Sequence, residues 1–139
     1  MSLVTGGCSC GAIRFECDAE AVASFNCHCK SCRQYSGAPY WSASIFPSAT
    51  FQLTSGEISW NTQTGDNGGV IHRGFCASCG SPVYNRLDRL PHVIGIPVGS
   101  MDDSSMHVPK MDLYVSQALS WVVMNSEIPK FDLGLVAKS

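Results

Sequence analysis

Hydrophobic and polar residues alternate over short stretches of this chain, and this alternation predicts β-strands. Ile13, Phe15 and Cys17 alternate with Arg14 and Glu16, a pattern typical of a half-buried strand. Similar short apolar stretches predict further strands at Tyr40 to Phe46, Phe51 to Thr54, Ile58 to Asn61, Val70 to Phe75, Pro82 to Asn85, Val93 to Val98 and Met111 to Val115. No long segment shows a 3.6-residue period. The pattern therefore predicts a mainly β fold.

The same reading leaves room for at most one or two short helices. One is predicted from Cys29 to Ser36, where Gly37 would end it as a C-terminal cap. The stretch Gln63 to Gly69 is rich in glycine and holds no large apolar residue, so we expect a mobile loop there. There is no repeat or linker in the 139 residues, and we expect residues 1–139 to form a single domain.

Charge and apolar runs exclude some classes of partner. Only 14% of the residues are charged, against about 25% in an average domain, and the nine Lys and Arg form no run. A nucleic-acid-binding surface needs a basic stripe, so we expect no nucleic-acid partner. No apolar run reaches membrane-spanning length, and the first residues do not resemble a secretory signal. We therefore expect a cytoplasmic protein without a membrane partner; the sequence does not predict an oligomeric state.

Eight cysteines are the main chemical feature of the chain, and they stand in close groups. The groups are Cys8 and Cys10, then Cys27, Cys29 and Cys32, then Cys76 and Cys79; Cys17 stands apart. Disulfides are rare in a reducing compartment, and such close spacings suit several thiolates on one tetrahedral zinc ion. The alternative is a disulfide scaffold of a secreted protein, for which these spacings are awkward.

The seven grouped cysteines divide into four and three ligands. The pairs Cys8/Cys10 and Cys76/Cys79 together complete a four-thiolate structural site, whereas Cys27, Cys29 and Cys32 hold a second ion and leave one position open. We therefore expect two zinc ions per chain. The three cysteines of the second group all come from one short segment, and no distant segment of the chain is expected to fix their geometry. We therefore expect this second site to lose its metal first.

Two residues are alternatives for the open position. Cys17 falls in phase with Ile13 and Phe15, which favours core packing over ligation. His28 stands between two ligands and should point away from the metal, where a solvent-facing imidazole would be able to touch a substrate. The other histidines, at positions 72, 92 and 107, have no ligand spacing, and we interpret them as ordinary surface or edge residues.

Three segments around the cysteines resemble the glutathione-dependent formaldehyde-activating enzyme family, which also contains the centromere protein V domain. They are residues 6–15 (GGCSCGAIRF), 27–39 (CHCKSCRQYSGAP) and 73–82 (RGFCASCGSP), and the resemblance continues through residues 99–103, 120–121 and 129–131, so it covers nearly the whole chain. The resemblance implies a β-tent of stacked antiparallel sheets around zinc knuckles. It also implies the division of cysteines into a structural and a catalytic-type zinc site, and Cys17 matches no ligand position.

The activity that the resemblance implies is carbon–sulfur lyase chemistry, in which glutathione adds to formaldehyde to give S-(hydroxymethyl)glutathione. An open zinc would accept a small thiol such as glutathione as a thiolate. Because three thiolates already outweigh the charge of the ion, a thiolate substrate needs positive partners, for which Lys30, Arg33 and Arg73 are candidates.

Other classes of function are also considered. A non-catalytic zinc module that binds a thiol or a protein partner would have a closed second site. A zinc deaminase would need an H-x-E or C-x-E motif, and the chain has none. A thioredoxin-like reading of Cys76 and Cys79 lacks the surrounding βαβ pattern.

Overall fold

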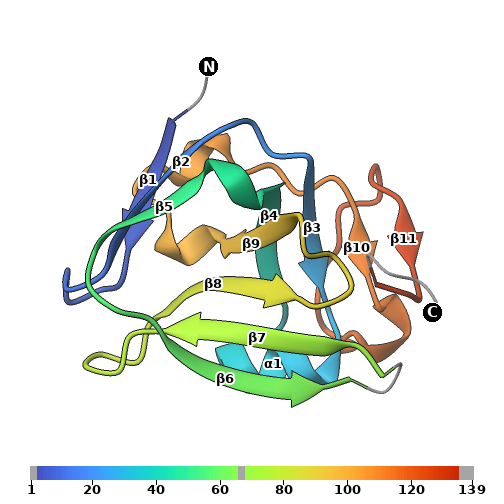
Figure 1. The fold of residues 1–139 in the computed structure, drawn as a ribbon. Helices are drawn as coiled ribbons and strands as arrows, with labels where there is room; N and C mark the ends of the chain where they lie inside the picture. Colours follow the sequence, from blue (N-terminus) through green and yellow to red (C-terminus); the bar gives the residue numbers. More distant parts are fainter. Residues whose placement is uncertain (1–2, 66–67, 135–139) are drawn as a thin grey trace.

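The computed structural model describes residues 3–65 and 68–134, and its fold is mainly β (Figure 1). The strands are β1 Leu3–Gly7, β2 Arg14–Asp18, β3 Ala23–Cys27, β4 Trp41–Pro47, β5 Phe51–Ser55, β6 Ser59–Thr64, β7 Val70–Phe75, β8 Pro82–Leu87, β9 Val93–Pro97, β10 Asp112–Leu113 and β11 Lys130–Phe131. The helices are α1 Lys30–Ser36 and the short 3₁₀ turns η1 Ser48–Thr50, η2 Val98–Ser100, η3 Ser104–Met106 and η4 Val115–Gln117. The prediction of a mainly β fold is confirmed.

The strands form two sheets. The smaller has the order β1-β2-β5, and the larger has the order β11-β10-β3-β4-β9-β8-β7-β6. Most strand pairs are antiparallel, as expected, and at one edge β10 pairs in parallel with both β3 and β11. Strand β10 lies within the strand predicted from Met111 to Val115, whereas the two-residue strand β11 was not predicted.

Two apolar clusters hold the layers together. The first lies between the sheets and contains Ile13, which precedes β2, and Phe15 and Cys17 of β2, with Phe46 of β4 and residues of β8 and β9. The second contains Trp41, Ala43 and Ile45 of β4, and Tyr35 of α1 packs against it. Strand β4 therefore contributes to both clusters and links the two sheets to the helix.

The short helix begins and ends largely as predicted. Cys29 is its N-cap rather than its first residue, because the Cys29 Sγ accepts a hydrogen bond from the Cys32 backbone N–H. Gly37 ends it with a φ of 70°, in the left-handed region that favours glycine. In the predicted loop from Gln63 to Gly69, β6 extends to Thr64, and residues 66–67 lie outside the described residues. Among the described residues, no helix has the length and apolar character needed to cross a membrane.

Candidate functional site

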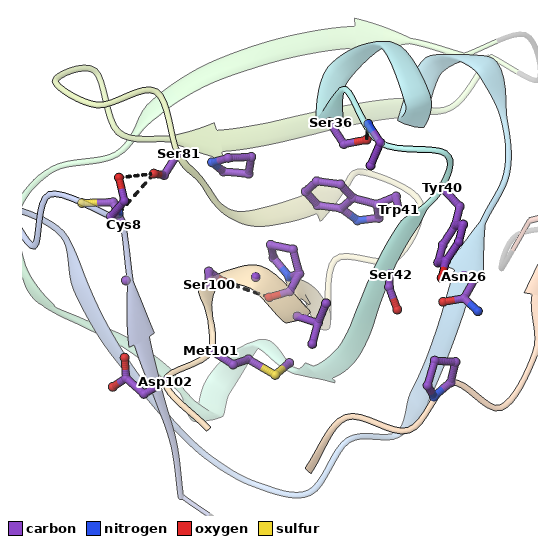
Figure 2. Close-up of a pocket in the computed structure, with 18 of the residues that line it drawn as sticks. Cys8, Asn26, Ser36, Tyr40, Trp41, Ser42, Ser81, Ser100, Met101 and Asp102 are labelled. Atoms are coloured by element: carbon purple, nitrogen blue, oxygen red, sulfur yellow. Dashed lines mark hydrogen bonds between the residues drawn. The ribbon is translucent and has the colours of Figure 1, made fainter. Parts of the chain in front are cut away.

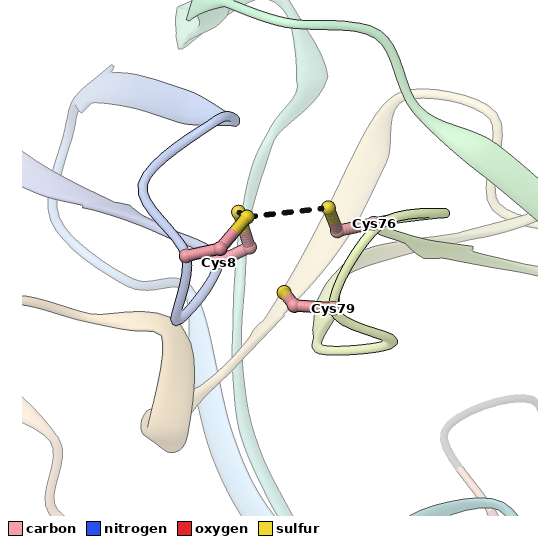
Figure 3. Close-up of side chains that lie close together, drawn as sticks. Cys8, Cys76 and Cys79 are labelled. Atoms are coloured by element: carbon pink, nitrogen blue, oxygen red, sulfur yellow. Dashed lines mark hydrogen bonds between the residues drawn. The ribbon is translucent and has the colours of Figure 1, made fainter.

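Four cysteines from two distant turns meet at one end of the molecule. Cys8 and Cys10 lie between β1 and β2, and Cys76 and Cys79 lie between β7 and β8. Their four sulfur atoms all lie within 4.8 Å of one another, and Figure 3 shows the sulfurs of Cys8, Cys76 and Cys79 converging from the two segments. The predicted adjacency of the two pairs is therefore found.

Tight turns give each of these pairs its shape. The amide of Gly80, which has a φ of 79°, donates to the Cys76 carbonyl at 2.7 Å and turns the chain back. Around the first pair, the Ile13 amide donates to the Cys8 sulfur at 3.2 Å. Amide hydrogens that point at sulfur stabilise the thiolate form, which is the form that binds a metal.

The donor set of this group fits a tetrahedral zinc ion. Sulfur atoms on such an ion stand about 3.8 Å apart, given zinc–sulfur bonds near 2.3 Å. The Cys8 and Cys10 sulfurs are 3.5 Å apart, and those of Cys10 and Cys76 are 3.8 Å apart. Hydrogen bonding by Ser81 and Ser9 lowers the pKa of Cys79 to about 5. The group therefore has the donor atoms and the spacing to hold a metal ion.

Three cysteines form the second group, where β3 leads into α1. Cys27 ends β3 and is buried, Cys29 is the N-cap of α1, and Cys32 is in its first turn. Their sulfurs also lie within 4.8 Å of one another. Hydrogen bonds from Cys27 and Cys32 lower the pKa of Cys29, so the Cys29 thiolate is favoured. A second thiolate beside it would be repelled, and the pKa of Cys27 is raised. The donor set again suits zinc, with three protein ligands rather than four.

Neither alternative for the fourth position belongs to this second group. Cys17 is fully buried in the first apolar cluster, where its sulfur is 3.3 Å from the Thr50 hydroxyl, which confirms core packing. The His28 ring turns away from the cysteines, as expected, but it does not face solvent. It is 1% exposed, and its Nε2 lies 2.9 Å from Oδ1 of Asp112, because β10 covers it.

The three basic residues that the sequence singled out occupy different environments. Lys30 is exposed at the start of α1. The Arg33 guanidinium donates to the carbonyls of His28 and Gln117 at 3.3 Å and 3.2 Å, so it ties the second group to the C-terminal part of the chain. Arg73 is only 3% exposed, so it is no ordinary surface charge.

Arg73 lies against the helix that carries two of the three cysteines. Its guanidinium donates to the Ser31 hydroxyl at 3.0 Å and to the side chain of Gln63, and it stands over the Tyr35 ring at 4.9 Å. After the hydrogen bonds within the cysteine group, the Arg73 charge is a further cause of the lowered pKa of Cys29. The pattern of β7 gave no sign that this arginine points inward.

A cleft of about 810 Å³ opens beside both cysteine groups (Figure 2). It reaches from Cys8 and Ser81 at one end to Tyr40 and Trp41, which follow α1, at the other. Its walls also include Asn26, Ser36, Ser42, Pro97, Val98, Gly99, Ser100, Met101 and Asp102. Cys27, Cys29 and Cys32 are not among the lining residues, so the second group and the cleft are neighbouring but separate features.

Comparison with known proteins agrees with this architecture. A Halomonas elongata protein, named as a candidate glutathione-dependent formaldehyde-activating enzyme, is 26% identical over 130 residues, which are 89% of this chain and 82% of that protein. A crystal structure of a Rhodobacter sphaeroides protein has a similar fold, with a TM-score of 0.55 and 19% identity over 91% of this chain and 98% of the other.

The sequence profile of a family matches most of the chain, from residue 3 to residue 117. This span includes all seven grouped cysteines and both turns that bring the four-cysteine group together. The chain belongs to the glutathione-dependent formaldehyde-activating enzyme family.

Proposed function

We propose that this protein is a zinc-dependent carbon–sulfur lyase that acts on a glutathione adduct, in the manner of an S-(hydroxymethyl)glutathione synthase. The observation that carries the proposal is the three-cysteine group, which offers three thiolates and no fourth protein ligand among the described residues. Membership of the formaldehyde-activating family supports glutathione and formaldehyde as the substrate classes. The working compartment would be the cytoplasm.

Two zinc ions would be held by different sets of residues. Cys8, Cys10, Cys76 and Cys79 would bind the structural ion, and Cys27, Cys29 and Cys32 would bind the second. When bound, the second zinc would supply Lewis acidity that keeps a substrate thiol ionised near neutral pH. The closed four-thiolate site would contribute to folding, as structural zinc does in other small domains.

Arg73 would offset the negative charge of the second site. Three thiolates outweigh a divalent cation, and a substrate thiolate adds to the excess. A guanidinium is always protonated, and this one is fixed on Ser31 beside the N-terminal turn of α1. It would therefore favour a thiolate substrate there without having to rearrange.

The two other basic residues would contribute less directly. Lys30 is exposed beside Cys29 and would pair with a carboxylate of glutathione. Arg33 already uses its Nε and Nη2 on backbone carbonyls, so its part in substrate binding would be to position the cysteine segment.

In the proposed reaction the glutathione sulfur attacks the carbon of formaldehyde. A carbon–sulfur bond forms, the carbonyl π pair moves to oxygen, and that oxygen takes a proton from water to give the hydroxymethyl group. The lyase direction reverses each step. Thiolates also add to formaldehyde unaided, so an enzymatic role has to be measured as acceleration over the spontaneous exchange.

One observation favours a second function, that of a non-catalytic zinc module that binds a thiol or a protein partner. The large cleft is not lined by Cys27, Cys29 or Cys32. A thiol bound at the second group would then lie outside this cleft.

Cobalt substitution tests the proposal directly. The protein is loaded with Co²⁺ at both sites and titrated with glutathione, while the sulfur-to-metal charge-transfer band is recorded. We expect the band to shift in the wild type and to stay unchanged in Cys29→Ser. If the charge-transfer band does not respond to glutathione while both sites hold Co²⁺, the proposed binding of a thiol at the second site is wrong.

A second measurement separates the two functions. Exchange between glutathione, formaldehyde and the hydroxymethyl adduct is followed by NMR magnetisation transfer with the zinc-loaded protein. Acceleration that is lost in Cys29→Ser supports the lyase. A cobalt band shift without acceleration supports the binding module and rejects the enzyme.

A further inference from the structure

A line of hydrogen bonds connects three serines and a histidine on one face of the larger sheet. The Ser42 hydroxyl lies 2.6 Å from His107 Nε2, and the Ser44 hydroxyl lies 2.7 Å from His107 Nδ1. Ser44 is in turn 2.7 Å from the Ser24 hydroxyl. Both ring nitrogens of His107 are therefore held by hydroxyl groups.

The β-sheet places these side chains in register. Ser42 and Ser44 are two residues apart on β4, so they project from the same face. Ser24 of β3 is the cross-strand partner of Ser44. His107 follows η3 and lies partly buried against this face, so its interpretation as an ordinary surface or edge residue is wrong. The sequence gave no sign of the contact, because 63 residues separate His107 from Ser44.

This arrangement is the one that activates a serine hydroxyl. A serine becomes nucleophilic when an imidazole nitrogen accepts its proton and a third group orients the ring through the other nitrogen. Here Ser44 orients the ring through Nδ1, and Nε2 would accept the Ser42 proton in the tautomer in which Nδ1–H donates to the Ser44 hydroxyl. Burial lowers the pKa of His107, which favours the neutral ring that is able to take a proton.

Ser42 is also accessible from the cleft. It lines the wall next to Asn26, its cross-strand partner on β3, and Figure 2 shows the two side chains close together on that wall. The Asn26 amide donates one hydrogen to Asp112 at 3.3 Å, and its Nδ2 carries a second hydrogen. A hydrogen-bond donor is thus available beside the hydroxyl, where negative charge would develop on a substrate carbonyl oxygen.

We propose that Ser42 and His107 form a second reactive site, in which Ser42 accepts an acyl group from a small activated ester or thioester bound in the cleft. The Ser42 oxygen forms a bond to the acyl carbon, and its proton moves to His107 Nε2. The carbon–oxygen or carbon–sulfur bond to the leaving group then breaks, and His107 returns the proton to that group. Water then attacks the acyl carbon, and His107 Nε2 takes a proton from that water. The bond between the acyl carbon and the Ser42 oxygen breaks, and His107 returns the proton to Ser42. None of the seven grouped cysteines takes part, so the site is independent of the proposed lyase function.

The test is covalent labelling of the zinc-loaded wild-type protein. A fluorophosphonate probe and p-nitrophenyl acetate are applied in turn, and the modified residue is identified by peptide mass spectrometry. We expect one label per chain, on Ser42, and a release of p-nitrophenol that the probe prevents. Mapping the label on the wild type requires no variant to fold.

Variants then assign the roles. Ser42→Ala should abolish labelling, and His107→Gln should slow it about 100-fold, the typical contribution of a general base. Ser36→Ala is the matched control, because Ser36 also lines the cleft but donates its hydroxyl to the Cys32 carbonyl at 2.8 Å rather than to a histidine. Circular dichroism and zinc content show that each variant is folded.

Two outcomes would overturn the proposal. Absence of label on Ser42 in the folded wild type would mean that His107 only anchors the segment after η3 to the sheet. Equal labelling of the wild type and His107→Gln would mean that Ser42 is exposed but not activated.

Discussion

The imidazole of His28 and the carboxylate of Asp112 lie 2.9 Å apart, and both side chains are 1% exposed. Since a carboxylate only accepts hydrogen bonds, the His28 Nε2 carries the hydrogen that joins them. The pair connects the segment between Cys27 and Cys29 to β10, which is 84 residues away in sequence. The His28 amide adds a second link, to the Leu113 carbonyl at 3.0 Å.

This link corrects the expectation that nothing distant holds the three-cysteine group. The segment is fixed by β10 on one side and by Arg73 of β7 through Ser31 on the other. Asp112 is itself held by Lys130 at 3.1 Å. The order in which the two metals are lost remains a prediction, and the structure gives the second group more support than its local spacing suggested.

Replacing Asp112 by Asn should therefore destabilise the domain. Loss of one partner from a buried charged network costs roughly 3 kcal/mol, and His28 and Lys130 both lose a charged acceptor. Burial by itself raises the pKa of Asp112, but hydrogen bonds from His28, Lys130 and Asn26 outweigh it and hold the pKa below its usual value of 3.8. Urea unfolding of the two zinc-loaded proteins measures the difference.

The pH dependence of this difference follows from the sign of the shift. A carboxylate with a depressed pKa stabilises the fold above its unfolded-state pKa and loses that effect only as pH falls through its folded-state value. The gap in unfolding free energy between wild type and Asp112→Asn should thus stay constant from about pH 8 to about pH 5. A gap that closes within this range would show that the pKa of Asp112 is not lowered.

Serine substitutions should separate the two cysteine groups. Cys76→Ser should leave the domain unfolded or insoluble, because structural zinc contributes on the order of 10 kcal/mol to folding. Cys29→Ser should keep the fold and lose one of two zinc ions. Zinc content and circular dichroism melts measure both effects.

Cys17→Ser is the matched control for burial in this series. Cys17 is 0% exposed but belongs to neither cysteine group, so its substitution should lower the melting temperature and leave both ions bound. Equal loss of fold in Cys76→Ser and Cys29→Ser would refute the division into structural and second sites.

The sequence predicted the two cysteine groups better than the contacts around them. Close cysteine spacing can be recognised within a few residues of sequence. A strand with strict alternation of apolar and polar residues, such as β2, can be recognised in the same way. Strand β3 was missed because Ala23 to Cys27 mixes polar and apolar residues, all of them buried or half-buried between β4 and β10. Arg73 was a candidate from the sequence, but its burial depends on Ser31 and Tyr35, which belong to another element.

Gly6 should tolerate no side chain. A Cβ there would lie 2.0 Å from the Ser100 carbonyl oxygen and 2.6 Å from the Phe15 ring, at the bridge between β1 and Met101. Gly6→Ala should cost about 3 kcal/mol or more through overpacking. Gly99→Ala is the control, since a Cβ added at Gly99 would have nothing within 4 Å. Equal melting temperatures for the two variants would contradict the close approach of β1 to η2.

Substitution of Arg73 tests whether its charge serves the second cysteine group. Arg73→Met removes the charge but keeps an apolar stem over Tyr35, and it should weaken glutathione binding to the cobalt-loaded protein about tenfold, or about 1.4 kcal/mol. Arg73→Lys keeps the charge but loses the planar guanidinium that reaches both Ser31 and Gln63. Its affinity for glutathione should therefore lie between those of the wild type and Arg73→Met. The cobalt charge-transfer titration gives all three dissociation constants.

Arg86→Met is the matched control for Arg73→Met. Arg86 lies on the neighbouring strand β8, stacks on Trp60 at 4.5 Å, and is exposed. Its loss changes the net charge by the same amount, but Arg86 is not among the groups given as causes of the pKa shifts of Cys29 and Cys32. Glutathione affinity should therefore stay at the wild-type value in Arg86→Met. If both variants weaken binding alike, the effect is one of overall charge, and Arg73 has no specific part in holding a thiolate beside α1.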